Sequence, residues 1–162
     1  MTSAQGATGF GDPKNPATVP VAARWLGGTG AIPFAGLAFL CVFAPESWSN
    51  WAAQAIAFYG AVILSFLGGI QWGLAISNTG ATDNQVTRLT LSVIPSLIAW
   101  AGLLLPLSAG LLVMVAAFAL VLYQDVAASR SGNAPSWYPK LRMPLSLLVM
   151  ASLLVGLMGT LI

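Results

Sequence analysis

Five long apolar segments, almost free of charged side chains, constrain the fold of this chain more than any other feature. They cover residues 25–44, 51–76, 88–105, 108–124 and 144–162. A helix of about 20 apolar residues crosses the hydrocarbon core of a bilayer, and a helix satisfies its own backbone hydrogen bonds there. The sequence therefore predicts an all-α integral membrane protein, with five transmembrane helices in residues 23–162 and a flexible polar tail in residues 1–22.

The composition excludes several classes of function. Hydrophobic residues make up 57% of the chain and charged residues only 6%, whereas soluble domains carry about 25% charged residues. There is no histidine and a single cysteine, Cys41, so His-ligated haem or zinc, a Ser-His pair and an internal disulfide are ruled out. We expect Cys41 to be a small buried hydrophobe. We predict no metal site, no catalytic residue and no nucleic-acid partner, and hence not an enzyme.

The distribution of charge predicts the orientation in the membrane. With five crossings, every cation falls on one side of the bilayer, namely Lys14, Arg24, Arg88, Arg130, Lys140 and Arg142, and Glu46 is the only charge on the other. Positive charge marks the cytoplasmic side. The N-terminus is therefore expected inside and the C-terminus outside. Residues 89–105 and 109–123 are expected to span fully, but a re-entrant hairpin would leave this charge count unchanged.

Sequence signals also place the ends of the later helices. Thr82 with Gln85 fits the capping-box spacing at the start of the third helix, which we expect to begin near Asn84. The residues from 124 to 143 contain several charges, prolines and a glycine and are expected to form the longest loop. Pro144 suits the first position of the last helix, because proline lacks the N–H that is unpaired there.

Small residues recur at every fourth position of the second apolar segment and predict close helix packing. The first set is Ala53, Ala57, Ala61, Ser65, Gly69 and Gly73, and a shorter set on the last segment is Ser152, Gly156 and Thr160. Small side chains let helix backbones approach, and this packing stabilises helix pairs in lipid. Four residues turn a helix by about 400°. The first set therefore winds around its helix and is expected to serve more than one neighbour, either within the chain or in another protein.

Few polar side chains lie near the apolar segments, and they are the candidates for ligand binding. Gln71 and Trp72, near the cytoplasmic end of the second segment, and Tyr123 and Asp125, at the end of the fourth, would lie near one mouth. Gln71 either binds a lipid or quinone headgroup or makes an interhelical hydrogen bond. Asp125 is expected at the interface, solvated or paired with Arg88 or Arg130. No ionisable residue is expected deep in the membrane, which argues against a proton-coupled or charged-substrate transporter.

Aromatic and basic residues at the segment ends are expected to anchor the protein at the membrane surface. These residues are Trp25, Trp48, Trp51, Trp137, Tyr138, Lys140 and Arg142. Tryptophan and tyrosine favour the headgroup region, and lysine and arginine contact anionic lipid phosphates.

Two stretches carry a resemblance to a known family. The run YGAVILSFLGGIQWG at residues 59–73, and Trp137, Tyr138, Leu141 and Arg142 before the last segment, resemble the small membrane proteins catalogued as domain of unknown function 3429. The resemblance covers the chain from about Trp25 onward. It implies a bacterial cytoplasmic (inner) membrane or a mitochondrial one, and it implies no established activity.

Two functions of different classes follow as hypotheses. The first is a non-catalytic accessory or assembly subunit that packs against a larger respiratory or photosynthetic membrane complex, favoured by the small-residue sets, the short loops and the lack of catalytic groups. The second is a binding protein or carrier for a lipid or a quinone. In both cases the partners are membrane lipids and other membrane-protein subunits or a second copy of the chain, and no cofactor is expected beyond a bound lipid or quinone.

Overall fold

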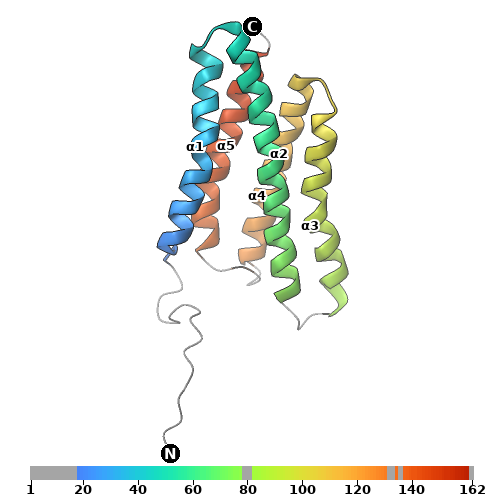
Figure 1. Cartoon of the computed structure of the whole chain (residues 1–162). Helices are drawn as coiled ribbons and strands as arrows, with labels where there is room; N and C mark the ends of the chain where they lie inside the picture. Colours follow the sequence, from blue (N-terminus) through green and yellow to red (C-terminus); the bar gives the residue numbers. More distant parts are fainter. Residues whose placement is uncertain (1–17, 78–81, 131–133, 135–136, 161–162) are drawn as a thin grey trace, which may run out of the picture.

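The described part of the chain folds into five α-helices in a computed structural model that describes residues 18–77, 82–130, 134 and 137–160 (Figure 1). The helices are α1 (Val21–Phe43), α2 (Glu46–Ser77), α3 (Thr82–Leu103), α4 (Leu107–Arg130) and α5 (Tyr138–Gly159). Each is long and apolar enough to cross a membrane. The predicted all-α membrane fold with five transmembrane helices is therefore confirmed.

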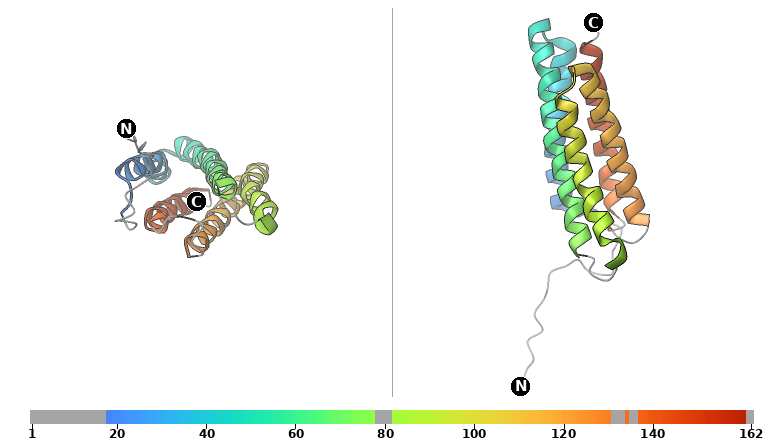
Figure 2. Two further views of the ribbon diagram at one scale, coloured as in Figure 1. Left: turned by 90° about the horizontal axis from the view of Figure 1, so that it is seen from below. Right: turned by 90° about the vertical axis from the view of Figure 1, so that its right-hand side faces the viewer.

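The longest helix, α2, forms the centre of the bundle. It contacts each of the other four described helices, and the remaining contacts join α1 to α5, α5 to α4 and α4 to α3 (Figure 2). The main core lies where α1, α2, α4 and α5 meet, around the fully buried side chains of Phe34, Ile56, Leu111, Phe118 and Leu153. Apolar side chains on the outer faces of the helices remain exposed, as expected for surfaces that face lipid.

The two ends of the bundle differ in charge. Helix α1 begins at one end and α5 finishes at the other (Figure 1). The described cations all lie near the end where α1 begins, because Arg24, Arg88, Arg130, Lys140 and Arg142 sit close to helix termini at that end. Glu46 lies in the first turn of α2, at the opposite end. This is the asymmetry from which the sequence predicts the orientation.

Two helix ends differ substantially from the prediction. Helix α4 continues to Arg130 instead of ending near residue 124, and α5 begins at Tyr138 instead of Pro144. The long loop predicted for residues 124–143 is therefore wrong over most of its length. Helix α4 continues because the residues after Asp125 include the helix formers Ala127 and Ala128. Helix α5 carries Pro139 in its first turn, where the missing N–H costs little.

The other helix starts lie closer to expectation. Helix α3 begins at Thr82, two residues before the predicted start. The side chains of Thr82, Asp83 and Asn84 lie outside the described residues, so the predicted capping box stays a prediction. Helix α2 begins at Glu46, which places Trp48 and Trp51 in its first turns, with their rings 5.9 Å apart and edge to face. Most of the predicted tail, residues 1–17, also lies outside the described part.

Glycines bring α3 against both of its neighbours. A methyl group added at Gly68 of α2 would lie 2.5 Å from the carbonyl oxygen of Ser92 in α3. One added at Gly110 of α4 would lie 2.5 Å from the carbonyl oxygen of Gly102 in α3. Backbone atoms therefore meet directly at both contacts, and a larger residue would force the helices apart.

The predicted small-residue set on α2 divides into two halves in the structure. Ala53, Ala57 and Ala61 are buried in the core, whereas Ser65, Gly69 and Gly73 are exposed. Ser152 and Gly156 of α5 are buried, and Thr160, which directly follows that helix, is half-buried. The two sets meet where a methyl group at Gly156 would lie 3.8 Å from the Cα atom of Ala53.

Candidate functional site

Three polar side chains from three helices form a network inside the bundle. The guanidinium of Arg142 in α5 donates from Nε to Oδ2 of Asp125 in α4 over 2.7 Å. The other carboxylate oxygen, Oδ1, accepts a hydrogen bond from Nε2 of Gln71 in α2. Asp125 is 1% exposed and Arg142 is 8% exposed. Gln71 is half-buried. The network therefore ties α2, α4 and α5 together, with its charged pair enclosed by the protein.

The position of this network explains why it is tolerated in a membrane. The three residues lie between four and six residues from the ends of their helices, or roughly 6–9 Å along the helix axis at 1.5 Å per residue. A buried charge is costly unless an opposite charge and hydrogen bonds compensate it. Both carboxylate oxygens of Asp125 accept a hydrogen bond, and Arg142 supplies the opposite charge.

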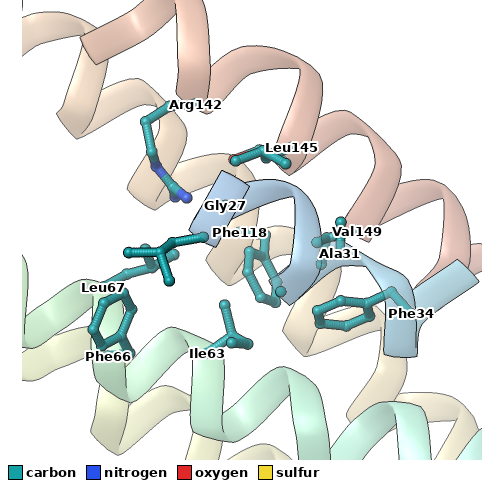
Figure 3. A pocket seen from close by; sticks show the side chains of 13 residues that line it. Gly27, Ala31, Phe34, Ile63, Phe66, Leu67, Phe118, Arg142, Leu145 and Val149 are labelled. Atoms are coloured by element: carbon teal, nitrogen blue, oxygen red, sulfur yellow. The ribbon is translucent and has the colours of Figure 1, made fainter. Parts of the chain in front are cut away.

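An apolar pocket adjoins the network. It has a volume of about 120 Å³ and is lined by α1, α2, α4 and α5 (Figure 3). Its walls are apolar side chains and two glycines, from Leu26, Gly27, Gly30, Ala31, Phe34, Ile63, Phe66, Leu67, Phe118, Leu145 and Val149, and its polar lining residues are Arg142 and Ser146. Figure 3 shows the guanidinium of Arg142 extending from α5 toward the apolar side chains. The pocket is thus an apolar space with one polar end.

Two hydrogen-bond donors at the polar end lack a partner. Among the described residues, neither Nη2 of Arg142 nor Oγ of Ser146 finds an acceptor, although both atoms are buried. Ser146 is 1% exposed. Buried polar groups in folded proteins are nearly always hydrogen-bonded, so each exception calls for an explanation. Here both exceptions lie in the lining of one pocket.

The pocket reaches the lipid-facing surface between α1 and α2. Of its lining residues, Leu26 of α1 is 73% exposed and Phe66 of α2 is 64% exposed. The two helices are joined at one end and diverge toward the other (Figure 1). At Gly30, which lines the pocket, α1 and α2 are connected by a hydrogen bond, because the hydroxyl of Tyr59 in α2 donates to the carbonyl oxygen of Gly30 over 2.9 Å. The edge of the pocket therefore includes residues of the surface that faces the bilayer.

The structure brings together only some of the residues predicted near one mouth. Gln71 and Asp125 are hydrogen-bonded to each other. Trp72 is 43% exposed, and Tyr123 is 72% exposed on the α4 surface, in a groove against α5. The expected partner of Asp125 was wrong, because the carboxylate pairs with Arg142 and not with Arg88 or Arg130. Both members of the pair are buried in the protein but lie close to the ends of their helices, so the expectation that no ionisable residue lies deep in the membrane stays a prediction.

Some of the predicted surface anchors are exposed in the structure, and others are buried. Trp25, Trp48 and Trp51 are exposed, and so is Lys140, while Trp137 is half-buried. Tyr138 and Arg142 are buried and so do not face the membrane surface. The prediction was wrong for these two residues because α5 begins earlier than expected, which turns both toward the core.

Ser146 was not predicted, although a sequence signal existed. Tyr138, Arg142 and Ser146 are spaced by four residues, so they share one face of a helix, and Val149 and Leu153 continue that buried face. The predicted start of the last helix at Pro144 placed Arg142 in a loop and Ser146 in a helix, so the two residues were not expected to share a helix face. The sequence holds no signal for the pairing of Arg142 with Asp125, which depends on how α4 and α5 pack. In the part of the chain that the structure describes, no three His, Cys, Asp or Glu side chains come together.

Comparison with known proteins places the chain in a family. The model of the family described as "Protein of unknown function (DUF3429)" matches residues 19–158. Transmembrane protein 69 of Xenopus tropicalis is 32% identical over 143 residues, which is 87% of this chain and 55% of that protein. Transmembrane protein 69 of Mus musculus is 27% identical over 140 residues, which is 85% of this chain and 56% of that protein.

The chain therefore spans about half the length of the curated relatives it matches. No solved structure matches it. The family match covers the whole of α1 to α4, all of α5 except its last residue, Gly159, and the whole of the pocket lining. The resemblance seen in residues 59–73 is thus confirmed, and this chain belongs to the DUF3429 family of proteins of unknown function.

Proposed function

We propose that this membrane protein is a non-catalytic binding protein for a small amphiphile of the bilayer, a lipid or a quinone, whose headgroup occupies the pocket. One observation carries the proposal, namely that the two buried donors without a partner, Arg142 Nη2 and Ser146 Oγ, both belong to the pocket lining. A ligand that supplies acceptors would remove the cost of leaving these donors unpaired.

The size and the opening of the pocket support an amphiphile rather than a water-soluble molecule. A volume of about 120 Å³ is below the roughly 300–1,000 Å³ of pockets that enclose a drug-sized ligand. The pocket suits a headgroup or a ring, and the attached chain would pass between Leu26 and Phe66 into the lipid. The apolar walls match such a ligand, because they gain by contact with carbon atoms.

Two neighbouring glycines of α1 offer a matched test. A side chain added at either Gly30 or Gly28 meets no other atom within 4 Å of its Cβ atom, but only Gly30 lines the pocket. We expect Gly30→Leu to fill the pocket and Gly28→Leu to leave it open. The proteins are gently solubilised from bilayers of bacterial polar lipids supplemented with decylubiquinone, and native mass spectrometry then measures the retained amphiphiles.

The expected result is that Gly30→Leu loses at least one lipid or quinone adduct that the wild type and Gly28→Leu both retain. Equal adducts in all three proteins, or no adduct in any of them, would overturn the proposal. Thermal unfolding followed by circular dichroism checks that both variants remain folded.

We propose a second function, that of an accessory or assembly subunit of a larger respiratory or photosynthetic membrane complex, on the strength of a separate observation. The second half of the small-residue set on α2, which consists of Ser65, Gly69 and Gly73, is exposed. Methyl groups added at Gly69 or Gly73 would meet no atom within 4 Å. A helix of another protein can approach closely at such a surface.

Bulky substitutions test this second function. Gly69→Leu with Gly73→Leu should release the protein from any complex on native gels, so that it migrates as free protein of 16.7 kDa. The control is Gly36→Leu, because Gly36 of α1 is equally open. Migration of the wild type as free protein or as a homo-oligomer would argue against the subunit function.

We also propose that the charged end of the bundle faces the cytoplasm of a bacterial cell, in the cytoplasmic membrane. The support is the gathering of Arg24, Arg130 and Lys140 at that end, with Glu46 at the other. In a background in which Cys41 is replaced by alanine, Glu46→Cys should react with an impermeant maleimide in intact cells, and Lys140→Cys only after lysis. The reverse pattern would contradict the proposal.

A further inference from the structure

Resting on the proposed binding function, we infer that the ligand headgroup is uncharged and enters the pocket with a carbonyl oxygen toward Arg142 and Ser146. The acceptor comes from a quinone ring or from a lipid ester, which share this chemistry. The inference follows from the charges and donors at the polar end of the pocket, in three steps.

The first step concerns charge. Arg142 is the only charged residue among the described residues that line the pocket. Its charge is already compensated, because Nε donates to Asp125 at 2.7 Å and the carboxylate is buried. An anionic headgroup would place a second negative charge next to that carboxylate, with one guanidinium between them. A buried net charge in apolar surroundings is far more costly than a buried carbonyl group.

The second step concerns hydrogen bonds. The unpartnered atoms are Nη2 of Arg142, which can only donate, and the hydroxyl of Ser146. A carbonyl oxygen has two lone pairs and accepts two donors. One uncharged carbonyl therefore matches both groups, whereas a ligand that only donates leaves Nη2 unpaired.

The third step compares serines on the same helix. Ser152 of α5 donates to the carbonyl oxygen of Leu148 four residues earlier, over 3.0 Å. This is the usual bond of a serine within a helix. Ser146, which is also buried and lies on the same helix, makes no such bond. Its hydroxyl is therefore available to a ligand in the pocket, and Ser152 provides the matched control.

Two uncharged probes and one anion separate the possibilities. Methyl palmitate and decylubiquinone, each labelled with ¹³C at its carbonyl carbons, are added separately to the protein in lipid nanodiscs, with empty nanodiscs as the baseline. Hexadecanesulfonate, which has the same kind of chain but stays ionised, serves as competitor. Infrared spectroscopy measures the bound probe, because a hydrogen-bonded carbonyl absorbs at lower frequency than a carbonyl free in the lipid.

We expect one of the uncharged probes to show a shifted carbonyl band with the wild type. Ser146→Ala should weaken its binding about fivefold, as expected for one lost hydrogen bond, and should reduce the band shift. Ser152→Ala should leave both unchanged. Equimolar hexadecanesulfonate should not displace the probe. A shifted band for methyl palmitate alone identifies a lipid ester, and one for decylubiquinone alone identifies a quinone.

Two other results would overturn the inference and differ in what they imply for the binding function. Displacement of the uncharged probe by hexadecanesulfonate at equal or lower concentration, or retention of the sulfonate alone, would show that the headgroup is anionic while the binding function stands. If no probe binds the wild type and Gly30→Leu loses no adduct, the binding function itself fails.

Discussion

Small residues allow tight helix packing on the α3 side of this bundle, whereas on the α1 side they line an open pocket. On the α3 side, Gly68 and Gly110 bring backbone atoms of neighbouring helices into contact. On the α1 side, Gly30 lines a pocket and a side chain there would meet nothing within 4 Å. The same residue type thus gives tight packing in one place and an open space in the other. Glycine permits a close approach, but the rest of the packing decides whether the approach is made.

The α3 side and the charged end of the bundle also differ in the interactions that stabilise them. The contacts of α3 with α2 and α4 rest on van der Waals packing of backbones and need no polar group. At the charged end, α2, α4 and α5 are joined by Gln71, Asp125 and Arg142. A buried polar network has a fixed geometry, so a donor stays unpaired wherever no acceptor lies within hydrogen-bond distance. We therefore expect the stability of the α3 side to depend on residue size, and that of the polar end to depend on charge compensation.

The largest expected effect is at the polar end. Asp125→Leu leaves the buried guanidinium of Arg142 without its partner, which should lower the free energy of unfolding by about 3–5 kcal/mol. Replacing both residues, as Asp125→Leu with Arg142→Met, should recover at least half of the loss, because no unpaired charge remains. Unfolding in a detergent mixture, followed by circular dichroism, measures both. A double variant less stable than the single one would contradict charge compensation as the reason.

An intermediate effect is expected on the α3 side, where adjacent glycines serve as test and control. Gly68→Ala places a methyl group against the backbone of Ser92 and should destabilise the protein by about 1–3 kcal/mol through overpacking. Gly69→Ala meets no atom within 4 Å and should be neutral or stabilising by up to about 1 kcal/mol, because alanine favours the helix. Thermal unfolding in detergent compares the two variants. Equal destabilisation would mean that helix propensity, not contact, governs this side.

The smallest effect is expected in the pocket lining. Ser146→Ala removes a buried hydroxyl without a hydrogen-bond partner, so in the absence of ligand it should leave stability unchanged or raise it by up to about 1 kcal/mol. Ser152→Ala removes a hydrogen bond to Leu148 within the helix and should cost about 0.5 kcal/mol once the higher helix propensity of alanine is counted. The same unfolding measurement on delipidated protein distinguishes them. A loss for Ser146→Ala larger than that for Ser152→Ala would show that Ser146 has a structural bond after all.

Much of the fold could be predicted, because the transfer of apolar side chains from water into lipid acts on each segment separately. Hydropathy alone locates the five helices, and the five cations of the described residues mark one end of the bundle. The helix ends were less predictable. The preference of proline for the first turn of a helix predicted a start at Pro144. The helix in fact begins at Tyr138, where tertiary packing buries its first turns. Of the candidate site, Gln71 and Asp125 were singled out as the few polar groups near apolar segments, but Tyr123 was placed with them and lies on the exposed surface.

The sequence by itself determined that the chain crosses a membrane with five helices and that the cations of the described residues gather at one end, because insertion of a segment into lipid depends on the composition of that segment. Only the tertiary structure decided that Asp125 pairs with Arg142, that half of the α2 small residues face outward, and that Ser146 lines a pocket. These facts depend on the rotation and separation of packed helices. Both arise from the sum of many weak side-chain contacts between segments distant in the chain, which no local pattern records.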